Sequence, residues 1–156
     1  MKPNNITRML DARKIPYTAF ELPAEKLGAL ETAQLLGIAP EQVFKTIVVT
    51  REGKGKPILA ITPGDKEVDL KALAKALGEK KLFLPTEREA EHLTGLQAGG
   101  ISPLALLQRG FQVVIDLSAQ AFDEINISGG QRGLNIRLSA SALAGLTNAT
   151  FADFAR

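Results

Sequence analysis

The segment LTGLQAGGISPL, residues 93–104, holds the residues best suited to binding an anion. Gly99 and Gly100 carry no Cβ and can adopt positive φ angles. Ser102 is a favoured N-cap residue, and Pro103 suits the first position of a helix. A helix that begins there leaves backbone N–H groups free to bind a phosphate or an oxyanion. A plain turn into a helix uses the same residue types, so the spacing alone leaves both interpretations open.

A lysine at the start of a predicted strand is the second candidate for chemistry. In VFKTIVV, residues 43–49, side chains alternate between two faces, so Lys45 and Ile47 share one face and Phe44 and Thr46 the other. Such a lysine either protects an edge strand, with its ammonium group in water, or holds a charge at the mouth of an apolar pocket. In the second interpretation it binds a phosphate or a developing oxyanion.

Several classes of active site are excluded by residue types that are rare or missing. The chain has no cysteine, which excludes disulfides, thiolate nucleophiles and thiolate metal ligands. Most zinc and Ser-His-Asp sites need several imidazoles or a correctly placed one, and the chain has a single histidine, His92. We expect His92 on a helix in an exposed or capping role. We interpret Ser102 as a cap rather than a nucleophile, and we expect neither a metal nor a cofactor.

Length and composition favour one globular domain that spans residues 1–156. The chain is 45% hydrophobic, and no apolar run approaches the ~20 residues that a membrane span requires. The first residues also lack the apolar core of a signal peptide. We therefore expect a cytoplasmic protein with no membrane contact.

The net charge of +2 is distributed unevenly. Residues 51–81 hold eight lysines and arginines against five acidic residues, whereas residues 82–156 hold five against seven. The basic residues of the middle segment are either a solvated face or a weak polyanion patch. They are Arg51, Lys54, Lys56, Lys66, Lys71, Lys75, Lys80 and Lys81.

Apolar periodicity, caps and turn residues predict an alternation of helices and strands. Helices are expected over residues 5–14, 30–37, 70–77, 103–108 and 139–146, with a further helix that follows Thr86 and carries His92. Strands are expected over residues 17–22, 44–49, 57–63, 80–85, 111–117, 125–128 and 134–139. Asp69 caps one helix, and Thr86 with Glu89 forms a capping box. Two short connections predict hairpins within a mixed sheet, so the fold class is α/β.

The motifs together resemble the YbaK/EbsC family of aminoacyl-tRNA deacylases. They are VFKTIVV, LAITPGDKEVDLKALAKALG, Leu93-Thr94-Gly95, AGGISPL and ISGGQRGLNIRL, and they extend the similarity over about residues 5–154. The resemblance implies a free-standing relative of the editing domain inserted in bacterial prolyl-tRNA synthetases. It also implies a mixed α+β fold in which helices surround a curved, barrel-like sheet.

The family resemblance assigns roles to particular residues. The family's key lysine falls on Lys45, and its glycine-rich substrate loop falls on Gly99, Gly100, Ile101, Ser102 and Pro103. The catalytic candidates are Lys45, Gly99 and Gly100. Further substrate-binding candidates are Phe20, Thr46, Thr94, Gly95 and Asn135. Related deacylases often have an acidic residue after RGL, and Asn135 at this place puts a general-base role in doubt.

The resemblance further implies trans-editing of Cys-tRNA(Pro) at its aminoacylated 3′ end. In that mechanism the thiol of the substrate attacks the ester, so the enzyme is a hydrolase or a lyase by mechanism, and prolyl-tRNA synthetase is a candidate partner. One alternative is the deacylation of Ala-tRNA(Pro) or of another small aminoacyl-tRNA. A second alternative is a non-catalytic module that binds tRNA or a synthetase.

Overall fold

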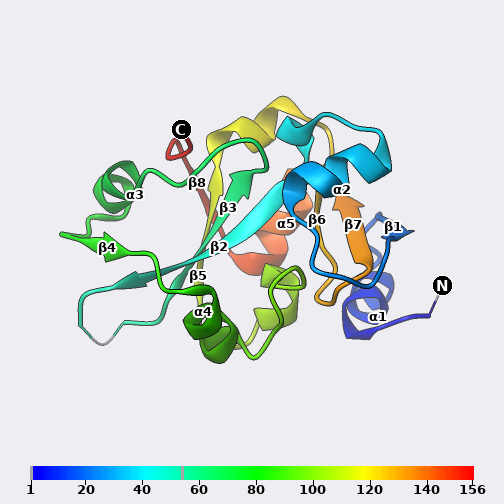
Figure 1. Ribbon diagram of the computed structural model, residues 1–156, viewed down its shortest axis with the longest axis horizontal. Coiled ribbons are helices and arrows are strands. Elements are labelled where there is room, and N and C mark those ends of the chain that lie inside the picture. Colours follow the sequence, from blue (N-terminus) through cyan, green and yellow to red (C-terminus); the bar gives the residue numbers. More distant parts are fainter. Residues whose placement is uncertain (1, 54) are drawn as a thin grey trace.

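The computed structural model describes residues 2–53 and 55–156, and within them the chain forms five α-helices, eight strands and three short 3₁₀ helices (Figure 1). The helices are α1 (Asn5–Ala12), α2 (Ala29–Leu36), α3 (Leu70–Leu77), α4 (Glu87–Thr94) and α5 (Ala140–Thr147). The strands are β1 (Thr18–Glu21), β2 (Phe44–Arg51), β3 (Ile58–Pro63), β4 (Leu82–Phe83), β5 (Gln112–Asp116), β6 (Ile125–Ser128), β7 (Leu134–Leu138) and β8 (Thr150–Ala152). The 3₁₀ helices are Pro40–Gln42, Pro103–Leu106 and Leu117–Ala121.

The strands form two sheets, one with the order β4-β2-β3-β5-β8 and one with the order β1-β7-β6. The larger sheet is mixed, because β2 runs antiparallel to β3 while β3, β5 and β8 run parallel. The predicted α/β class and mixed sheet are therefore confirmed. The expected barrel-like sheet was wrong in detail: the strands form two sheets that share the larger apolar core, one isolated bridge links Val43 to Asn126, and no closed barrel forms among the described residues.

The hairpin of β2 and β3 is the centre of the larger sheet. Its antiparallel register pairs Lys45 with Thr62 and Val48 with Leu59, as the predicted hairpin requires. All six residues of β3 are buried, because this strand has neighbours on both edges and apolar layers on both faces. β2 is more exposed, and Lys45, Thr46 and Ile47 are all partly accessible.

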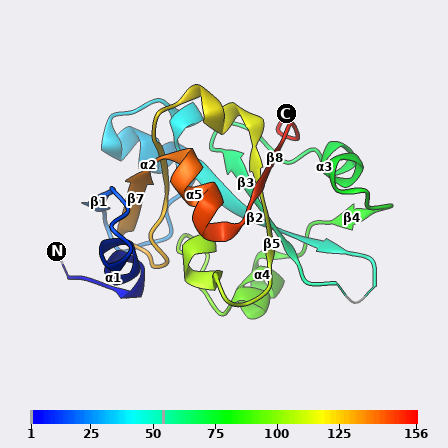
Figure 2. The ribbon, with the colours of Figure 1, turned by 180° about the vertical axis from the view of Figure 1, so that it is seen from behind.

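Two apolar layers cover the two faces of β3. Leu59 and Ile61 point into the larger layer, which also receives Leu10 of α1 and Leu143 of α5. The alternate residues of β3 point into a smaller layer that contains Leu73 of α3. Figures 1 and 2 show α3 beside one end of the large sheet and α5 between the two sheets. The period-two pattern of β3 thus connects both layers through one strand.

Most predicted helix boundaries are confirmed by their caps. The Asp69 side chain accepts hydrogen bonds from the first turn of α3, and Thr86 with Glu89 forms the predicted capping box of α4. His92 is exposed on α4, as expected. The helix expected over residues 103–108 is instead the 3₁₀ helix Pro103–Leu106, and the sequence patterns missed β8.

A buried carboxylate fixes the C-terminal segment against the large sheet. Asp116 is 3% exposed, and its Oδ1 accepts hydrogen bonds from the N–H groups of Phe154 and Ala155, each at 3.0 Å. Its Oδ2 accepts from the N–H and hydroxyl groups of Ser118 at 3.1 and 2.5 Å. The chain therefore leaves β8 in a defined direction, toward the segment that contains Glu67.

We expect Asp116→Ala to lower the free energy of unfolding by about 2–4 kcal/mol, because four donors lose a buried acceptor. Urea denaturation followed by circular dichroism measures this change. Asp153→Ala is the matched control, because Asp153 is exposed and lies in the same C-terminal segment. Equal stability of the two variants would contradict the anchoring role of Asp116.

Candidate functional site

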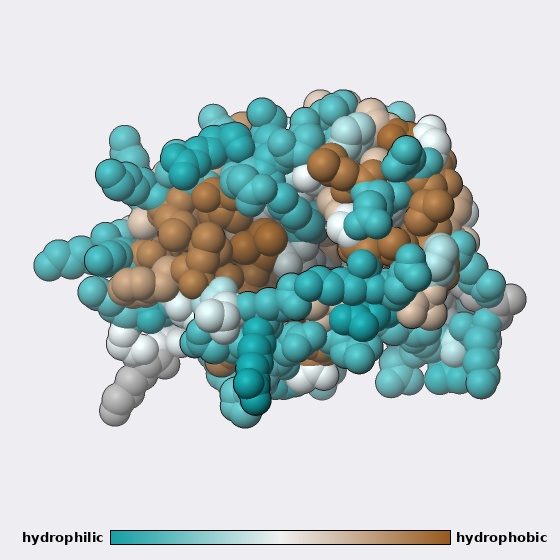
Figure 3. Space-filling model, in the orientation of Figure 1, coloured by the Kyte–Doolittle hydropathy of each residue, from teal (hydrophilic) through white to brown (hydrophobic). Residues whose placement is uncertain are grey.

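A cavity of about 620 Å³ opens along the outer edge of β2. Its wall is built by the start of α2, by β2, by α4 and by the glycine loop, residues 97–102. Ser128 of β6 and Asn135 of β7 also line it. Figure 3 shows a hollow in this face, with an apolar area next to it over β2 and β4. A cavity of this size can accept a small molecule or the end of a larger one.

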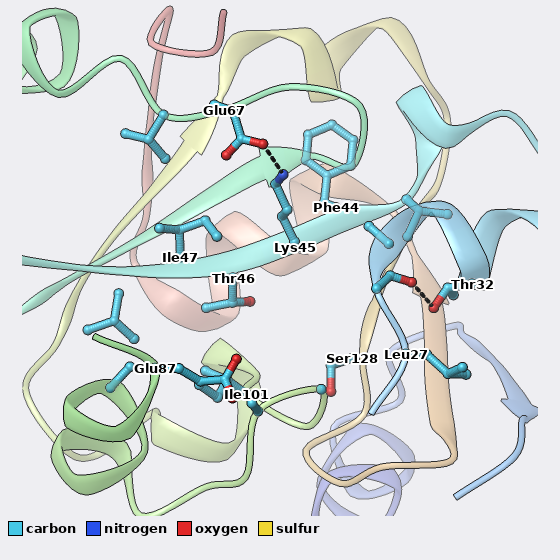
Figure 4. Close-up of a pocket in the computed structure, with 18 of the residues that line it drawn as sticks. Leu27, Thr32, Phe44, Lys45, Thr46, Ile47, Glu67, Glu87, Ile101 and Ser128 are labelled. Carbon is cyan, nitrogen blue, oxygen red and sulfur yellow. Dashed lines mark hydrogen bonds and ion pairs between the residues drawn. The ribbon is translucent and has the colours of Figure 1, made fainter. Parts of the chain in front are cut away.

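The cavity exists because the middle of β2 lacks a strand neighbour on this edge. Val43 bridges to β6 just before the strand, and β4 pairs only with Thr50 and Arg51 at its far end. Side chains from both faces of β2 can therefore reach the same space. Figure 4 shows Lys45 and Thr46 projecting to opposite sides of the strand, and both line the cavity.

The Lys45 ammonium group lies at the rim and is paired with one carboxylate. Its Nζ is 3.3 Å from Oε1 of Glu67, a residue of the segment that follows β3 (Figure 4). The Lys45 side chain is 24% exposed, whereas that of Glu67 is 78% exposed. A pair with one partner so exposed is held by less than about 1 kcal/mol. A ligand anion can therefore replace Glu67 at low cost.

The glycine loop differs from the sequence prediction in one respect. Gly99 adopts φ +89° and lines the cavity, but Gly100 is buried and its N–H donates to the Gln97 carbonyl at 2.8 Å. The expectation that the Gly100 amide is free was wrong, because the loop closes a tight turn with it. Within the described residues, the N–H groups of Gly99 and Ile101 have no protein acceptor, and both residues line the cavity.

Two charged side chains hold the glycine loop through the backbone of Ala98. Oε2 of Glu91 accepts from the Ala98 N–H at 2.7 Å, and Nε of Arg132 donates to the Ala98 carbonyl at 2.8 Å. Gly100 packs directly on the next loop, where an added Cβ would lie 2.9 Å from the Cα of Gln131. The loop thus needs glycine at 100 for space and glycine at 99 for its backbone angle.

Helix α4, which carries Glu91, is stabilised at its N-terminus by charge-assisted hydrogen bonds. The Thr86 backbone N–H and hydroxyl donate to the Glu89 carboxylate at 3.1 and 2.8 Å. These bonds, the backbone one foremost, lower the pKa of Glu89 below its usual value. These hydrogen bonds stabilise the folded protein at pH values above the usual pKa of a glutamate. The stabilisation is lost as the pH falls through the lowered pKa of Glu89.

The remaining predicted site residues fall into two groups. Asn135, with Thr46 and Ile101 described above, lines the cavity, but Thr94 and Gly95 do not, because they end α4. Ser102 and Pro103 are buried, and the Ser102 hydroxyl accepts from the Leu104 N–H as an N-cap.

Phe20 does not line the cavity either. Its ring lies 4.8 Å from the guanidinium carbon of Arg137.

Sequence patterns missed three charged or polar contributors. Glu67 and Arg132 lie far from their partners in sequence, and no local spacing could indicate them. Ser128 precedes two glycines, a weak signal, and its hydroxyl accepts from the Gly130 N–H. Glu87, which also lines the cavity, forms an exposed ion pair with Lys26, the residue before the lining residue Leu27, with 2.6 Å between Nζ and Oε2.

The basic middle segment contributes little to the cavity. Arg51 is mostly buried and donates to Glu79 and Gln112, so its role is structural. Lys54 lies outside the described residues. In the described chain no three histidine, aspartate or glutamate side chains are grouped so that they could hold a metal ion. None of the helices in residues 2–53 and 55–156 is long and apolar enough to cross a membrane.

Comparison with known proteins places this chain in a family. Residues 25–146 match the aminoacyl-tRNA editing domain. The chain is 37% identical over 151 residues to EbsC of Enterococcus faecalis, a candidate Cys-tRNA(Pro)/Cys-tRNA(Cys) deacylase, and the match covers 96% of this chain and 91% of that protein. It is 28% identical over 132 residues to the proline–tRNA ligase of Thermodesulfovibrio yellowstonii, a match that covers 85% of this chain but 22% of the ligase.

Solved structures agree with the sequence comparison. The crystal structure of a candidate trans-editing enzyme for prolyl tRNA synthetase superimposes with a TM-score of 0.78 at 25% identity, and the match covers 99% of both chains. The protein APE2540 has the same fold, with a TM-score of 0.88, 24% identity and coverage of 98% and 100%. The chain therefore belongs to the aminoacyl-tRNA editing domains. Within them it is of the YbaK/EbsC type, as its motifs predict.

We expect Gly100→Ala to lower the free energy of unfolding by about 1–3 kcal/mol, because the new methyl group meets backbone atoms that cannot move away. Gly145→Ala on α5 is the matched control. No atom lies within 4 Å of the added Cβ there, and alanine is favoured by about 0.5–1 kcal/mol in a helix. Denaturant titrations of both variants measure the difference, and a neutral Gly100→Ala would contradict the close packing of the loop.

Proposed function

We propose that this chain is a single-domain editing enzyme that removes a wrongly attached amino acid from tRNA, with Cys-tRNA(Pro) as its main substrate. The observation that carries the proposal is the cavity beside β2, which is lined by Lys45 and by Gly99 and Ile101, two residues whose N–H groups have no protein acceptor among the described residues. The family of the chain and its 37% identity to EbsC support the substrate class.

The proposed reaction uses the thiol of the substrate as nucleophile. The sulfur of the cysteinyl group forms a bond to the ester carbonyl carbon, the bond from that carbon to the ribose oxygen breaks, and the ribose oxygen takes up the thiol proton. The chain itself has no cysteine, and its single histidine is exposed on α4 away from the cavity lining. The protein then acts through position and electrostatics.

Each group has a role in this reaction. The N–H groups of Gly99 and Ile101 bind the carbonyl oxygen, where negative charge develops. Lys45 stabilises negative charge at the reacting end of the tRNA or anchors its terminal phosphate, once Glu67 has been displaced. Gly100 contributes by allowing the loop to pack closely, since its amide is already used. The partners are the aminoacylated 3′ end of tRNA and, as a second proposal, prolyl-tRNA synthetase.

We expect Lys45→Ala to lower kcat/KM for deacylation of Cys-tRNA(Pro) by roughly 10²–10³-fold, the usual loss when one donor to a developing charge is removed. Lys75→Ala on α3 is the matched control, because Lys75 is exposed and outside the cavity lining. Release of radiolabelled amino acid measures the rates, and circular dichroism checks the fold. Unchanged turnover in Lys45→Ala would remove Lys45 from the mechanism.

We expect a panel of Cys-, Ala-, Ser- and Pro-tRNA(Pro) to show rapid deacylation of the cysteinyl ester alone. Ser-tRNA(Pro) is the matched comparison, since its hydroxyl occupies the place of the thiol but ionises far less readily. Cleavage of Ala-tRNA(Pro) without Cys-tRNA(Pro) would overturn the thiol mechanism. Salt-sensitive tRNA binding without any hydrolysis would overturn the enzymatic function and favour a binding module.

A further inference from the structure

One face of the three-stranded sheet carries a buried set of connected polar side chains. Strand alternation turns Ile127 and Ile136 toward the core, so Asn126, Asn135 and Arg137 share the opposite face. Asn126 is fully buried and Asn135 is 5% exposed. Buried amides are costly without hydrogen bonds, so the direction of each bond in this set is a physical constraint.

The three side chains form a series of directed hydrogen bonds. Nε of Arg137 donates to Oδ1 of Asn126 at 3.0 Å, and Nδ2 of Asn126 donates to Oδ1 of Asn135 at 2.8 Å. The guanidinium group lies over the Phe20 ring at 4.8 Å, a favourable contact between a cation and an aromatic face. Phe20 thereby holds Arg137 in place on the side away from Asn126.

The order of the series follows from the chemistry of arginine. A guanidinium group only donates, so Asn126 must turn its oxygen toward Arg137 and its NH₂ group toward Asn135. Asn135 must then accept the hydrogen bond from the Asn126 NH₂ group with its own side-chain oxygen. One charged residue thus decides the orientation of two amides, either of which could be reversed if it stood alone.

The NH₂ group of Asn135 is left over by this series. In the described part of the chain this NH₂ group donates to no protein group. The side-chain atoms that are fully enclosed and lack a hydrogen-bond partner do not include it. It therefore keeps a surface open to solvent. Asn135 lines the cavity beside Ser128, so that surface faces the space in which Lys45 also lies.

We infer that Arg137 and Asn126 are positioning residues that fix Asn135 as a hydrogen-bond donor toward the substrate. This inference rests on the proposed function, and it specifies that Asn135 is the donor in its hydrogen bond with the substrate. The group that Asn135 meets must be a hydrogen-bond acceptor at the aminoacyl-adenosine end, which is a carbonyl oxygen, a hydroxyl oxygen or a ring nitrogen of the adenine. It cannot be the ammonium group of the amino acid, which has only donors to offer.

The decisive variant is Asn126→Asp, which leaves the cavity-lining residue unchanged. A carboxylate at position 126 accepts from both Arg137 and the Asn135 NH₂ group, so Asn135 rotates and presents its oxygen to the cavity. The positive charge of Arg137 compensates the negative charge of the new carboxylate. In side-chain amide NMR of the free protein, we expect slow hydrogen exchange to appear at the Asn135 NH₂ group. Unchanged exchange at Asn135 in the folded variant would overturn the orientation mechanism.

Activity tests the contact with substrate separately. We expect Asn126→Asp and Asn135→Ala each to lower kcat/KM for Cys-tRNA(Pro) by about ten-fold, the effect of one lost hydrogen bond. The double variant is expected to be no worse than Asn135→Ala, because position 126 acts only through 135. Additive losses, or full activity of Asn126→Asp with a reversed amide, would overturn the substrate contact.

A second variant guards against misfolding of Asn126→Asp. Arg137→Met removes the donor that sets the order, and we expect loss of exchange protection at the Asn126 NH₂ group together with lower kcat/KM. Arg109→Met is the matched control, since the Arg109 guanidinium lies over the Phe111 ring at 5.9 Å outside the cavity lining. Equal behaviour of the two arginine variants would overturn the role of Arg137.

Absence of deacylation by the wild type would refute the proposed function, whereas amide exchange would still decide the orientation of the Asn135 side chain.

Discussion

The open edge of β2 is the constraint on which the site depends. A strand edge exposes backbone groups that another strand would normally cover, and folded proteins usually block such edges. Here β4 and the bridge at Val43 cover only the two ends of β2. Helix α4 and the glycine loop lie across the cavity from the middle of the strand and do not pair with it. The uncovered stretch becomes one wall of a cavity, and side chains from both faces of the strand converge there. The chemistry of the site is thus a consequence of incomplete strand pairing.

The glycine loop supplies the opposite wall, and its rigidity comes from outside its own sequence. Glu91 and Arg132, from a helix and from a separate turn, both bind the backbone of Ala98. A loop held in this way keeps its free N–H groups at fixed positions before any substrate arrives. Such preorganisation is what makes backbone donors effective in stabilising charge. The cost is the requirement for glycine at two adjacent positions.

Elements of the fold could be predicted from the sequence where the interactions that decide them are local. Strand β2 follows from its β-branched residues, and the caps at Asp69, Thr86 and Ser102 follow from residue type and spacing. Whether the strands form one sheet or two depends on long-range pairing, such as that of β1 with β7, which no local pattern encodes. The motif resemblance supplied the family, whereas strand periodicity had already singled out Lys45.

The sequence could not specify the hydrogen bonds that close the site. The Gly100 amide is consumed by a turn whose acceptor lies three residues earlier, and composition cannot show that. The ion pair of Lys45 with Glu67 and the bond between Asn126 and Asn135 join residues 22 and 9 positions apart. Each depends on the register of strands that must first be folded together.

The anchoring of the C-terminal segment has a practical consequence. Arg156 exchanges two backbone hydrogen bonds with Glu67, at 2.9 and 3.0 Å, and lines the same cavity as Lys45. Figures 1 and 2 show the C-terminus near α3, away from α1 at the N-terminal end of the described chain. A purification tag, fluorophore or surface tether fused after Arg156 would therefore start at the entrance used by a ligand, whereas the N-terminal end offers an attachment point remote from it.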